Sequence, residues 1–301
     1  MKKIITRISE GLGNQLFMYA NSYALSKKLE YNLYIDNITA YRKLKIRSYL
    51  LDNFNIKGKL ANQDDIQDNY LKYLVHKLNK KIDFFRRKKN FLIEERSKNK
   101  ITQFQDYTNI SFADKIYVEG YFESEKYFKN YKNEILEQFT IKKIDKNNLF
   151  LNPSDIINHN SVSIVIRTDR FSEKKFDNLS LNKSKYFEKR TIDYIFKSIN
   201  FISSKVSNPK FFIFSDNTKG LNELFSQYKN CTVVNHLVNK AINDFYLSSL
   251  CNHFIVGPST FHWWSAYLSK NKNKICICPP DDLQFSSNKN IYPEKWLKLN
   301  L

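Results

Sequence analysis

The second half of the chain alternates apolar strands with helical stretches, and this alternation constrains the fold more than any other feature. Strands are expected at residues 161–167, 210–215, 232–235, 253–257 and 274–278. Stretches with apolar residues at helical spacing separate them, at 192–206, 218–228, 241–251 and 259–268. A helix after each strand returns the chain to the same edge of a sheet, so the pattern predicts a parallel sheet covered by helices.

The first half of the chain begins in the same way. A strand is expected at 3–8, a helix from Asn14 to Leu29 and a second strand at 31–35. A further strand ends near 117–122, and a helical stretch follows at 124–139. The polar stretch 145–160 is the candidate linker. We therefore expect two α/β domains, residues 1–150 and 151–301.

The charge of the chain is strongly positive, with 49 Lys and Arg against 30 Asp and Glu and a net charge of +19. Such an excess fits nucleic acid, a membrane surface or an anionic small molecule. Residues 71–100 alone hold 11 basic residues against 3 acidic ones, interleaved with aromatic side chains. This basic helical insertion either rests on anionic lipid or is simply solvated, and both interpretations stay open.

Several classes of protein are excluded by composition. No run approaches the roughly 18 apolar residues of a membrane span, and no signal-peptide pattern follows the first residues, so a cytoplasmic protein is expected. Cys231, Cys251, Cys276 and Cys278 lack zinc-site spacing and are predicted to be buried, reduced thiols. No signature of a nucleic-acid-binding fold is present, which makes that class the weaker alternative.

Polar residues stand where several expected strands end. Arg167 and Asp169 follow the strand at 161–167, Asp216 follows 210–215, and Ser259 to Phe261 follow Gly257-Pro258. Side chains at the carboxyl ends of parallel strands project into the ligand crevice of such sheets. An arginine there suits phosphate oxygens, and Ser and Thr hydroxyls at a helix N-terminus suit a diphosphate. Local alternatives are an Arg–Asp pair, a helix cap at Asp216 and a packed His262.

The turn Gly11-Leu12-Gly13-Asn14-Gln15 stands between the first strand and its helix. Backbone N–H groups at such a junction can approach an anion, because glycines remove the side chains that would block it. The turn is neither G-x-G-x-x-G nor a P-loop, so a tight structural turn is the alternative.

Five segments together resemble glycosyltransferase family 11, the α-1,2-fucosyltransferases of bacteria and animals. They are Gly11–Ala20 (GLGNQLFMYA), Gly120–Phe128 (GYFESEKYF), Phe214–Asn217 (FSDN), Asp244–Cys251 (DFYLSSLC) and Pro258–Leu268 (PSTFHWWSAYL). Each is weak alone, but their order over nearly the whole chain is specific.

This resemblance implies a GT-B-like architecture, in which two Rossmann-type halves face a cleft. The domain 1–150 would be the acceptor side, and 151–301 would bind the nucleotide sugar. The implied reaction is inverting, metal-independent and cofactor-free transfer of L-fucose from GDP-β-L-fucose to a hydroxyl of a surface-polysaccharide acceptor, such as the 2-OH of a galactoside. The expected partners are a GDP-sugar, a glycan or lipid-linked glycan, and an anionic inner-membrane surface at 71–100, with no nucleic acid.

The resemblance also assigns site residues. The catalytic residues would be Arg167, which stabilises the leaving diphosphate, and Asp169. The residues implied to bind the donor sugar nucleotide are Gly11, Gly13, Asn14, Gln15, Arg167, Asp216, Asp244, Ser259, Thr260 and Phe261. The candidates for the general base are Asp169, Glu10, Asp36 and His262.

One motif departs from the family pattern. The family signature H-x-R-R-x-D aligns with Val165, Arg167, Thr168 and Arg170, and a one-residue deletion would bring Asp169 into the Asp position. Val165 would suit a donor that lacks a hydroxyl, such as a further deoxygenated fucose. The open alternatives are therefore a related enzyme with another nucleotide sugar and a catalytically degraded binding module.

Overall fold

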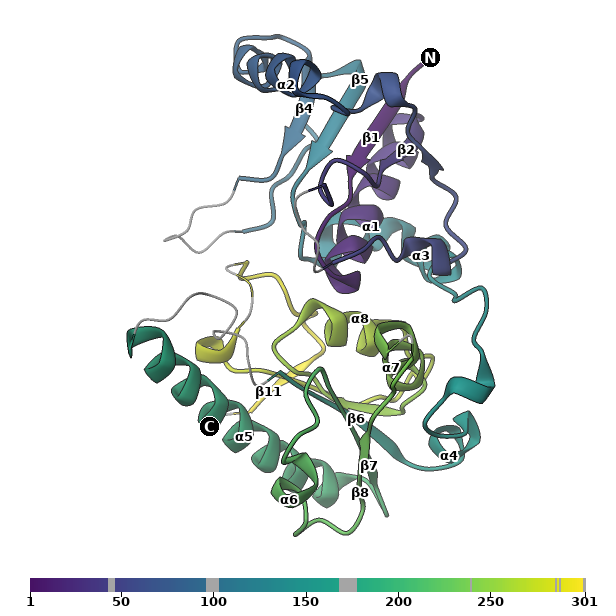
Figure 1. Ribbon diagram of the computed structural model, residues 1–301, viewed down its shortest axis with the longest axis vertical. Helices are drawn as coiled ribbons and strands as arrows, with labels where there is room; N and C mark the ends of the chain where they lie inside the picture. The colour runs from purple at the N-terminus through teal and green to yellow at the C-terminus, as the bar shows by residue number, and fades with distance from the viewer. Residues whose placement is uncertain are drawn as a thin grey trace. The chain divides into compact units, whose positions relative to one another are not determined.

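The computed structural model describes residues 1–42, 47–95, 103–167, 178–238, 240–284, 286 and 288–299. The chain divides into two compact units (Figure 1). Unit 1 is Met1–Lys142 with Ser286–Pro293, and unit 2 is Lys143–Phe285 with Glu294–Leu301.

The return of residues 286–293 to unit 1 differs from the expected single division at residue 150. Ser124 Oγ donates a hydrogen bond to the carbonyl of Asn290 at 2.7 Å, and Asn288 Nδ2 donates to the carbonyl of Glu123 at 3.3 Å. These hydrogen bonds attach residues 286–293 to the loop that follows the last strand of unit 1. No local sequence pattern encodes contacts between segments so far apart.

Unit 1 holds a five-stranded parallel sheet in the order β3-β2-β1-β5-β4. The strands are β1 (Lys3–Arg7), β2 (Asn32–Asp36), β3 (Lys59–Leu60), β4 (Lys89–Ile93) and β5 (Phe112–Glu119). The helices are α1 (Leu12–Leu29), α2 (Tyr70–Asp83) and α3 (Lys132–Gln138), with 3₁₀ turns at Leu51–Asn53, Gln63–Asp65, Glu125–Tyr127 and Lys129–Tyr131.

The two long helices of unit 1 cover opposite faces of the sheet. Leu25 of α1 belongs to the core cluster that holds Ile116 and Val118 of β5. His76 of α2 contacts Tyr117, whose ring centroid lies 4.7 Å away. Because side chains alternate along a strand, these contacts place α1 and α2 on the two sides of β5.

Two expectations for unit 1 need correction. The segment 71–100 was expected to be helical, but α2 ends at Asp83, and β4 pairs in parallel with β5. The carboxylate of Asp83 accepts the backbone N–H groups of Asn90 and Phe91, at 2.8 and 3.2 Å, which turns the chain into the strand. The stretch 124–139 is two 3₁₀ turns and then the short α3 rather than one helix.

Unit 2 holds a six-stranded parallel sheet in the order β11-β10-β9-β6-β7-β8. The strands are β6 (Ser161–Ile166), β7 (Lys210–Ser215), β8 (Cys231–Val234), β9 (His253–Ile255), β10 (Cys276–Cys278) and β11 (Leu297–Lys298). β7 and β8 follow on one side of β6, and β9, β10 and β11 then follow on its other side. β6 is thus the topological switch point, where open α/β sheets bind ligands.

Helices cover both faces of this second sheet (Figure 1). The helices are α4 (Pro153–Ile157), α5 (Asn178–Lys205), α6 (Leu221–Leu224), α7 (Lys240–Ser249) and α8 (Thr260–Leu268), with 3₁₀ turns at Lys146–Asn148 and Asp281–Leu283. Ile164 of β6 packs in one core cluster with Ile195 of α5 and Leu221 of α6. Ser163, the next residue back, faces α7 and α8 instead. The expected β/α alternation is therefore present.

Candidate active site

Three strand ends meet at the carboxyl edge of the sheet in unit 2. Arg167 directly follows β6, and Asp216 directly follows β7. Because β7 lies beside β6, the two side chains come together, and Arg167 Nε lies 4.0 Å from Asp216 Oδ2. Their side chains are 28% and 49% exposed, so a guanidinium and a carboxylate reach solvent at the switch point.

The turn after β9 approaches the same strand from its other side. A Cβ on Gly257 would lie 2.2 Å from the carbonyl oxygen of Val165, so only glycine lets the turn pack against β6. Ser259 then caps α8, because its Oγ accepts the N–H of His262 at 3.2 Å. Thr260 and Phe261, in the first turn of α8, are half-buried. The N-terminus of α8 is therefore held next to the end of β6.

His262 anchors this turn from inside the unit. Its side chain is fully buried, and Nδ1 accepts the N–H of Gly257 at 2.8 Å. Nε2 therefore carries the proton and donates to Ser163 Oγ at 3.0 Å. Burial lowers the pKa of His262 to about 3, so the imidazole is neutral. One ring nitrogen bonds the turn and the other bonds β6, so the buried ring has none left for an acceptor hydroxyl.

Asp244 is also committed to partners inside unit 2. The residue is buried on α7, where Oδ1 lies 2.6 Å from His236 Nδ1 and Oδ2 lies 3.0 Å from Lys240 Nζ. The first contact ties the loop after β8 to α7, and the second is an ion pair within α7. The structure thus gives this expected donor-binding residue a role in shaping the loop.

The glycine turn of unit 1 follows β1 and begins α1. Gly11 is the N-cap of α1, and its carbonyl accepts the N–H groups of Asn14 and Gln15, both at 3.1 Å. A Cβ on Gly11 would have one heavy atom within 4 Å among the described residues, Arg47 Nη1 at 3.9 Å. Gly13 is buried and Asn14 is half-buried. Unlike Gly257, Gly11 is not required by packing within the unit.

Gln15 has a scaffolding role. The side chain is fully buried, and Nε2 donates to the carbonyls of Glu10 and Ser48, both at 2.8 Å. Its Oε1 accepts the N–H of Leu50 at 2.9 Å. Gln15 therefore joins the start of α1 to the loop 48–50, and its amide is used up within unit 1.

Two candidates for the general base lie in unit 1. Asp36 is buried and accepts hydrogen bonds from Tyr117 Oη and Thr39 Oγ1, both at 2.5 Å. Glu10 is half-buried just beyond β1 and has a left-handed backbone with φ of 64°. A non-glycine residue rarely holds that conformation, and such strain gathers at functional sites. Asp169, Thr168 and Arg170 lie outside the described residues.

Comparison with known proteins decides the family. The sequence profile described as glycosyl transferase family 11 matches residues 3–300. The chain belongs to glycosyltransferase family 11.

Its relatives and structural neighbours agree. The chain is 27% identical to an alpha-1,2-colitosyltransferase of Escherichia coli, over 99% of both chains. It is 24% identical to the O-antigen biosynthesis glycosyltransferase WbnK of Escherichia coli, over 97% of this chain and 99% of the relative.

The fold matches solved fucosyltransferases. A mutant of Arabidopsis thaliana FUT1 in complex with GDP aligns with a TM-score of 0.55 at 15% identity, covering 94% of this chain and 71% of that one. Fucosyltransferase NodZ from Bradyrhizobium aligns with a TM-score of 0.50 at 14% identity, covering 89% and 92%. This glycosyltransferase therefore has the expected GT-B-like α/β fold.

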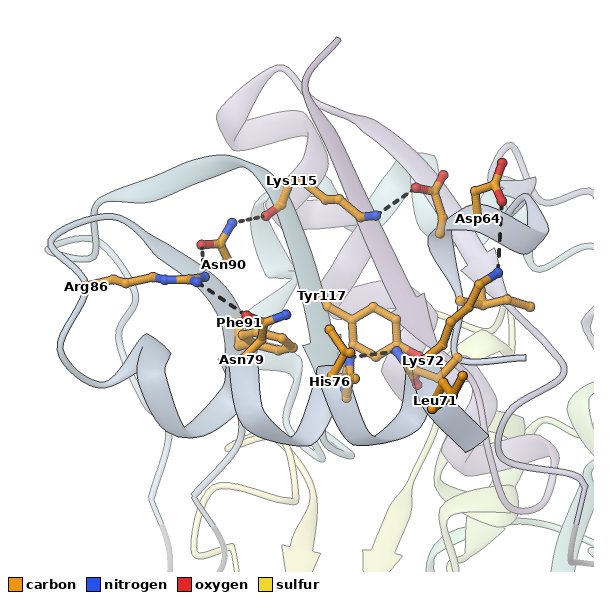
Figure 2. A pocket seen from close by; sticks show the side chains of 14 residues that line it. Asp64, Leu71, Lys72, His76, Asn79, Arg86, Asn90, Phe91, Lys115 and Tyr117 are labelled. Atoms are coloured by element: carbon orange, nitrogen blue, oxygen red, sulfur yellow. Dashed lines mark hydrogen bonds and ion pairs between the residues drawn. The ribbon is translucent and has the colours of Figure 1, made fainter. Parts of the chain in front are cut away.

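Sequence reasoning missed a hollow of about 430 Å³ in unit 1 of this glycosyltransferase (Figure 2). It lies between α2 and the sheet, and His76, Asn79 and Tyr117 are among its lining residues.

At the edge of the hollow, the carboxylate of Glu119 accepts hydrogen bonds from His76 Nε2 at 3.0 Å and from Lys80 Nζ at 2.5 Å. Burial raises the pKa of Glu119, but these two hydrogen bonds outweigh it and lower the pKa to about 2. Polar residues recur at helical spacing from 72 to 83, and this pattern could have indicated a polar helix face turned toward the sheet.

The cysteines of this family 11 member match the expectation of reduced thiols. All four are free, Cys231 is half-buried, and Cys251, Cys276 and Cys278 are buried. Burial raises the pKa of the Cys276 thiol to about 12 and that of Cys278 to about 11. The described ranges contain no group of His, Cys, Asp and Glu side chains that could hold a metal ion.

Proposed function

We propose that this glycosyltransferase catalyses inverting, metal-independent transfer of L-fucose from GDP-β-L-fucose to a hydroxyl of a surface-polysaccharide acceptor, the 2-OH of a galactoside. The observation that carries the proposal is the position of Arg167. Its guanidinium lies at the switch-point end of β6, next to Asp216. Membership of family 11 supplies the reaction class.

Arg167 would stabilise the leaving group. As the bond between sugar C1 and the β-phosphate oxygen breaks, negative charge develops on the diphosphate. A guanidinium and the backbone N–H groups at the start of α8 are suited to hold that charge without a metal. Asp216 would orient Arg167 or accept hydrogen bonds from hydroxyls of the nucleotide.

A general base would complete the reaction. The acceptor oxygen forms the new bond to C1 from the face opposite GDP, so the β-linked donor yields an α-linked product. The acceptor hydroxyl loses its proton to a carboxylate. We assign this role to Asp169, with Glu10 as the alternative, since the carboxylate of Asp36 and the imidazole of His262 are engaged within the protein.

A second candidate donor is GDP-colitose, in which the sugar is fucose without its 3-hydroxyl. Val165 is buried on β6, two residues before Arg167, at the position where the family signature has a histidine. An apolar side chain cannot hydrogen-bond a sugar hydroxyl, so it favours a donor without one. The colitosyltransferase relative supports this alternative. A higher kcat/KM for GDP-colitose than for GDP-fucose would identify it.

The acceptor would be a glycan or lipid-linked glycan made at the cytoplasmic face of a bacterial inner membrane. None of the helices in the described part of the chain combines the length and apolarity needed to cross a bilayer. Contact with the membrane would therefore be peripheral, through the basic segment at 71–100.

Replacement of Arg167 tests the proposal. Arg167→Ala should lower kcat by about 10²–10³-fold, the usual effect of removing one group that stabilises transition-state charge. Arg190→Ala is the matched control, because Arg190 pairs with Asp282 at 2.9 Å in the same unit. It should keep nearly full activity. Near-normal turnover of Arg167→Ala, with unchanged circular dichroism, would remove Arg167 from the mechanism.

A further inference from the structure

Helix α2 has its polar face turned toward the protein. Figure 2 shows His76 and Asn79 projecting from α2 toward the strand that carries Tyr117. Lys80 pairs with Glu119 of β5, and the buried Asp83 holds the backbone of β4. These inward residues recur at helical spacing, so a complete polar stripe faces the sheet.

The outer face of α2 is apolar, which reverses the usual arrangement of a surface helix. Leu71, Leu78 and Phe85 are 74%, 58% and 85% exposed. We call the exposed apolar side chains of α2 and the turn after it the docking face; it consists of Leu71, Leu74, Val75, Leu78, Ile82, Phe84 and Phe85. Leu71 and Val75 also border the hollow beneath α2. Most residues of the docking face are three or four positions apart, so they form one continuous stripe. A contiguous apolar patch of this kind marks an interaction surface.

The exposed charges of the described segment 70–90 are all positive. Lys77, Lys81, Arg87 and Lys88 are exposed on α2 and the turn that follows it. The sole acidic residue between 70 and 90 is Asp83, which is buried with its carboxylate oxygens bonded to the backbone. The surface of this segment therefore combines apolar side chains with unopposed cations.

We propose that the docking face lies in the interfacial layer of an anionic lipid membrane, with α2 parallel to the surface. Apolar side chains would enter the boundary between headgroups and acyl chains, and Lys77 and Lys81 would contact anionic headgroups. The charge pattern distinguishes this occupant from a second copy of the chain, because two such faces would bring like charges together. The docking face shares no residue with the strand ends proposed for sugar transfer.

Vesicle co-sedimentation of the full chain tests the proposal. The protein should bind vesicles of equal parts phosphatidylcholine and phosphatidylglycerol, but not phosphatidylcholine alone, and binding should weaken as salt is raised. Lys77→Gln with Lys81→Gln should lower partitioning roughly 30-fold, since each basic residue contributes about 1 kcal/mol. Leu78→Asn with Phe85→Asn should lower it at least about 10-fold through lost apolar burial.

Matched controls isolate the docking face. Leu237 is 90% exposed in unit 2, so Leu237→Asn removes an exposed leucine elsewhere. Lys229→Gln with Lys272→Gln removes two exposed charges of unit 2. Both control proteins should bind anionic vesicles like the unaltered chain. The thermal unfolding temperature of every variant should match that of the unaltered chain, because the replaced side chains are exposed.

Three results would overturn the proposal. The first is equal binding to both kinds of vesicle, and the second is unchanged binding of the Leu78/Phe85 variant. The third is a dimer in sedimentation equilibrium that the same variant dissociates, which would assign the docking face to a second copy. Binding is measured without nucleotide sugar or acceptor, so its failure leaves the proposed transfer reaction untouched.

Discussion

At the scale of single residues, two glycines at strand–helix junctions are held for different reasons. Gly257 is required by packing, because a Cβ there would meet the carbonyl oxygen of Val165 at 2.2 Å. Gly11 has room for a Cβ, with Arg47 Nη1 at 3.9 Å, and an ordinary φ of −79°. Packing therefore does not explain the glycine at position 11, and we propose that a ligand approaches the start of α1 there.

Alanine at these two positions should separate stability from activity. Gly257→Ala should lower the free energy of unfolding by about 1–3 kcal/mol, the usual cost of overpacking. Gly11→Ala should change it by less than about 1 kcal/mol, yet lower kcat/KM by at least about 10-fold. Urea unfolding and steady-state kinetics on both proteins check this. Full activity of a stable Gly11→Ala protein would rule out ligand approach at that turn.

Sequence reasoning located residues better than it assigned their roles. Arg167 and Asp216 could be placed because each follows an apolar strand, and the structure brings them together. The roles of the buried His262 and Gln15 depend on distant hydrogen-bond partners. His262 bonds Ser163, 99 residues away, and Gln15 bonds the carbonyl of Ser48, 33 residues away. A single sequence contains no local signal for such pairings.

At the scale of elements, the polar face between α2 and the sheet makes the stability of unit 1 sensitive to acid. The folded pKa of Glu119 is about 2, well below its ordinary value of 4.5. The stabilisation from its pairing with His76 and Lys80 is therefore fully present above about pH 4.5. It is lost as the pH falls from there toward 2, because the unfolded chain takes up the proton first.

Glu119→Gln should remove much of this pH dependence. The variant should be less stable than the unaltered chain at neutral pH, since the half-buried His76 and Lys80 lose their carboxylate partner. Its unfolding free energy should fall less steeply between about pH 4.5 and 3. Urea unfolding at several pH values measures both effects, and Glu137→Gln, at an exposed position in the same unit, is the control. An identical acid slope in Glu119→Gln and the unaltered chain would contradict the assignment.

The elements that sequence patterns predicted well are those with a regular period. The β/α alternation of unit 2 is present because each strand is a short apolar run and the longer helices have an apolar face. Composition marked 71–100 as basic and helical, but it did not reveal that α2 faces inward with its polar side or that 89–93 form an edge strand. Which face of an amphipathic helix packs against the protein depends on the residues of the sheet that it covers.

At the scale of the whole molecule, the order of five weak motifs identified the family before any fold was known. The profile match over residues 3–300 confirms it, and the two parallel sheets have the expected GT-B-like layout. The return of 286–293 to unit 1 was beyond sequence reasoning, because it rests on tertiary hydrogen bonds. We propose that Val165, where the sequence departs from the family signature, helps to select the sugar.

The central claim is metal-independent transfer of a 6-deoxyhexose from a GDP-sugar, and product analysis tests it most directly. The purified chain is incubated with a galactoside acceptor and GDP-fucose, GDP-colitose or a UDP-sugar, in excess EDTA. The predicted result is release of GDP and an α-1,2-linked product, seen by nuclear magnetic resonance, from one or both GDP-sugars. Transfer only from the UDP-sugar, a β-linked product, or activity that EDTA abolishes and Mg²⁺ restores would contradict it.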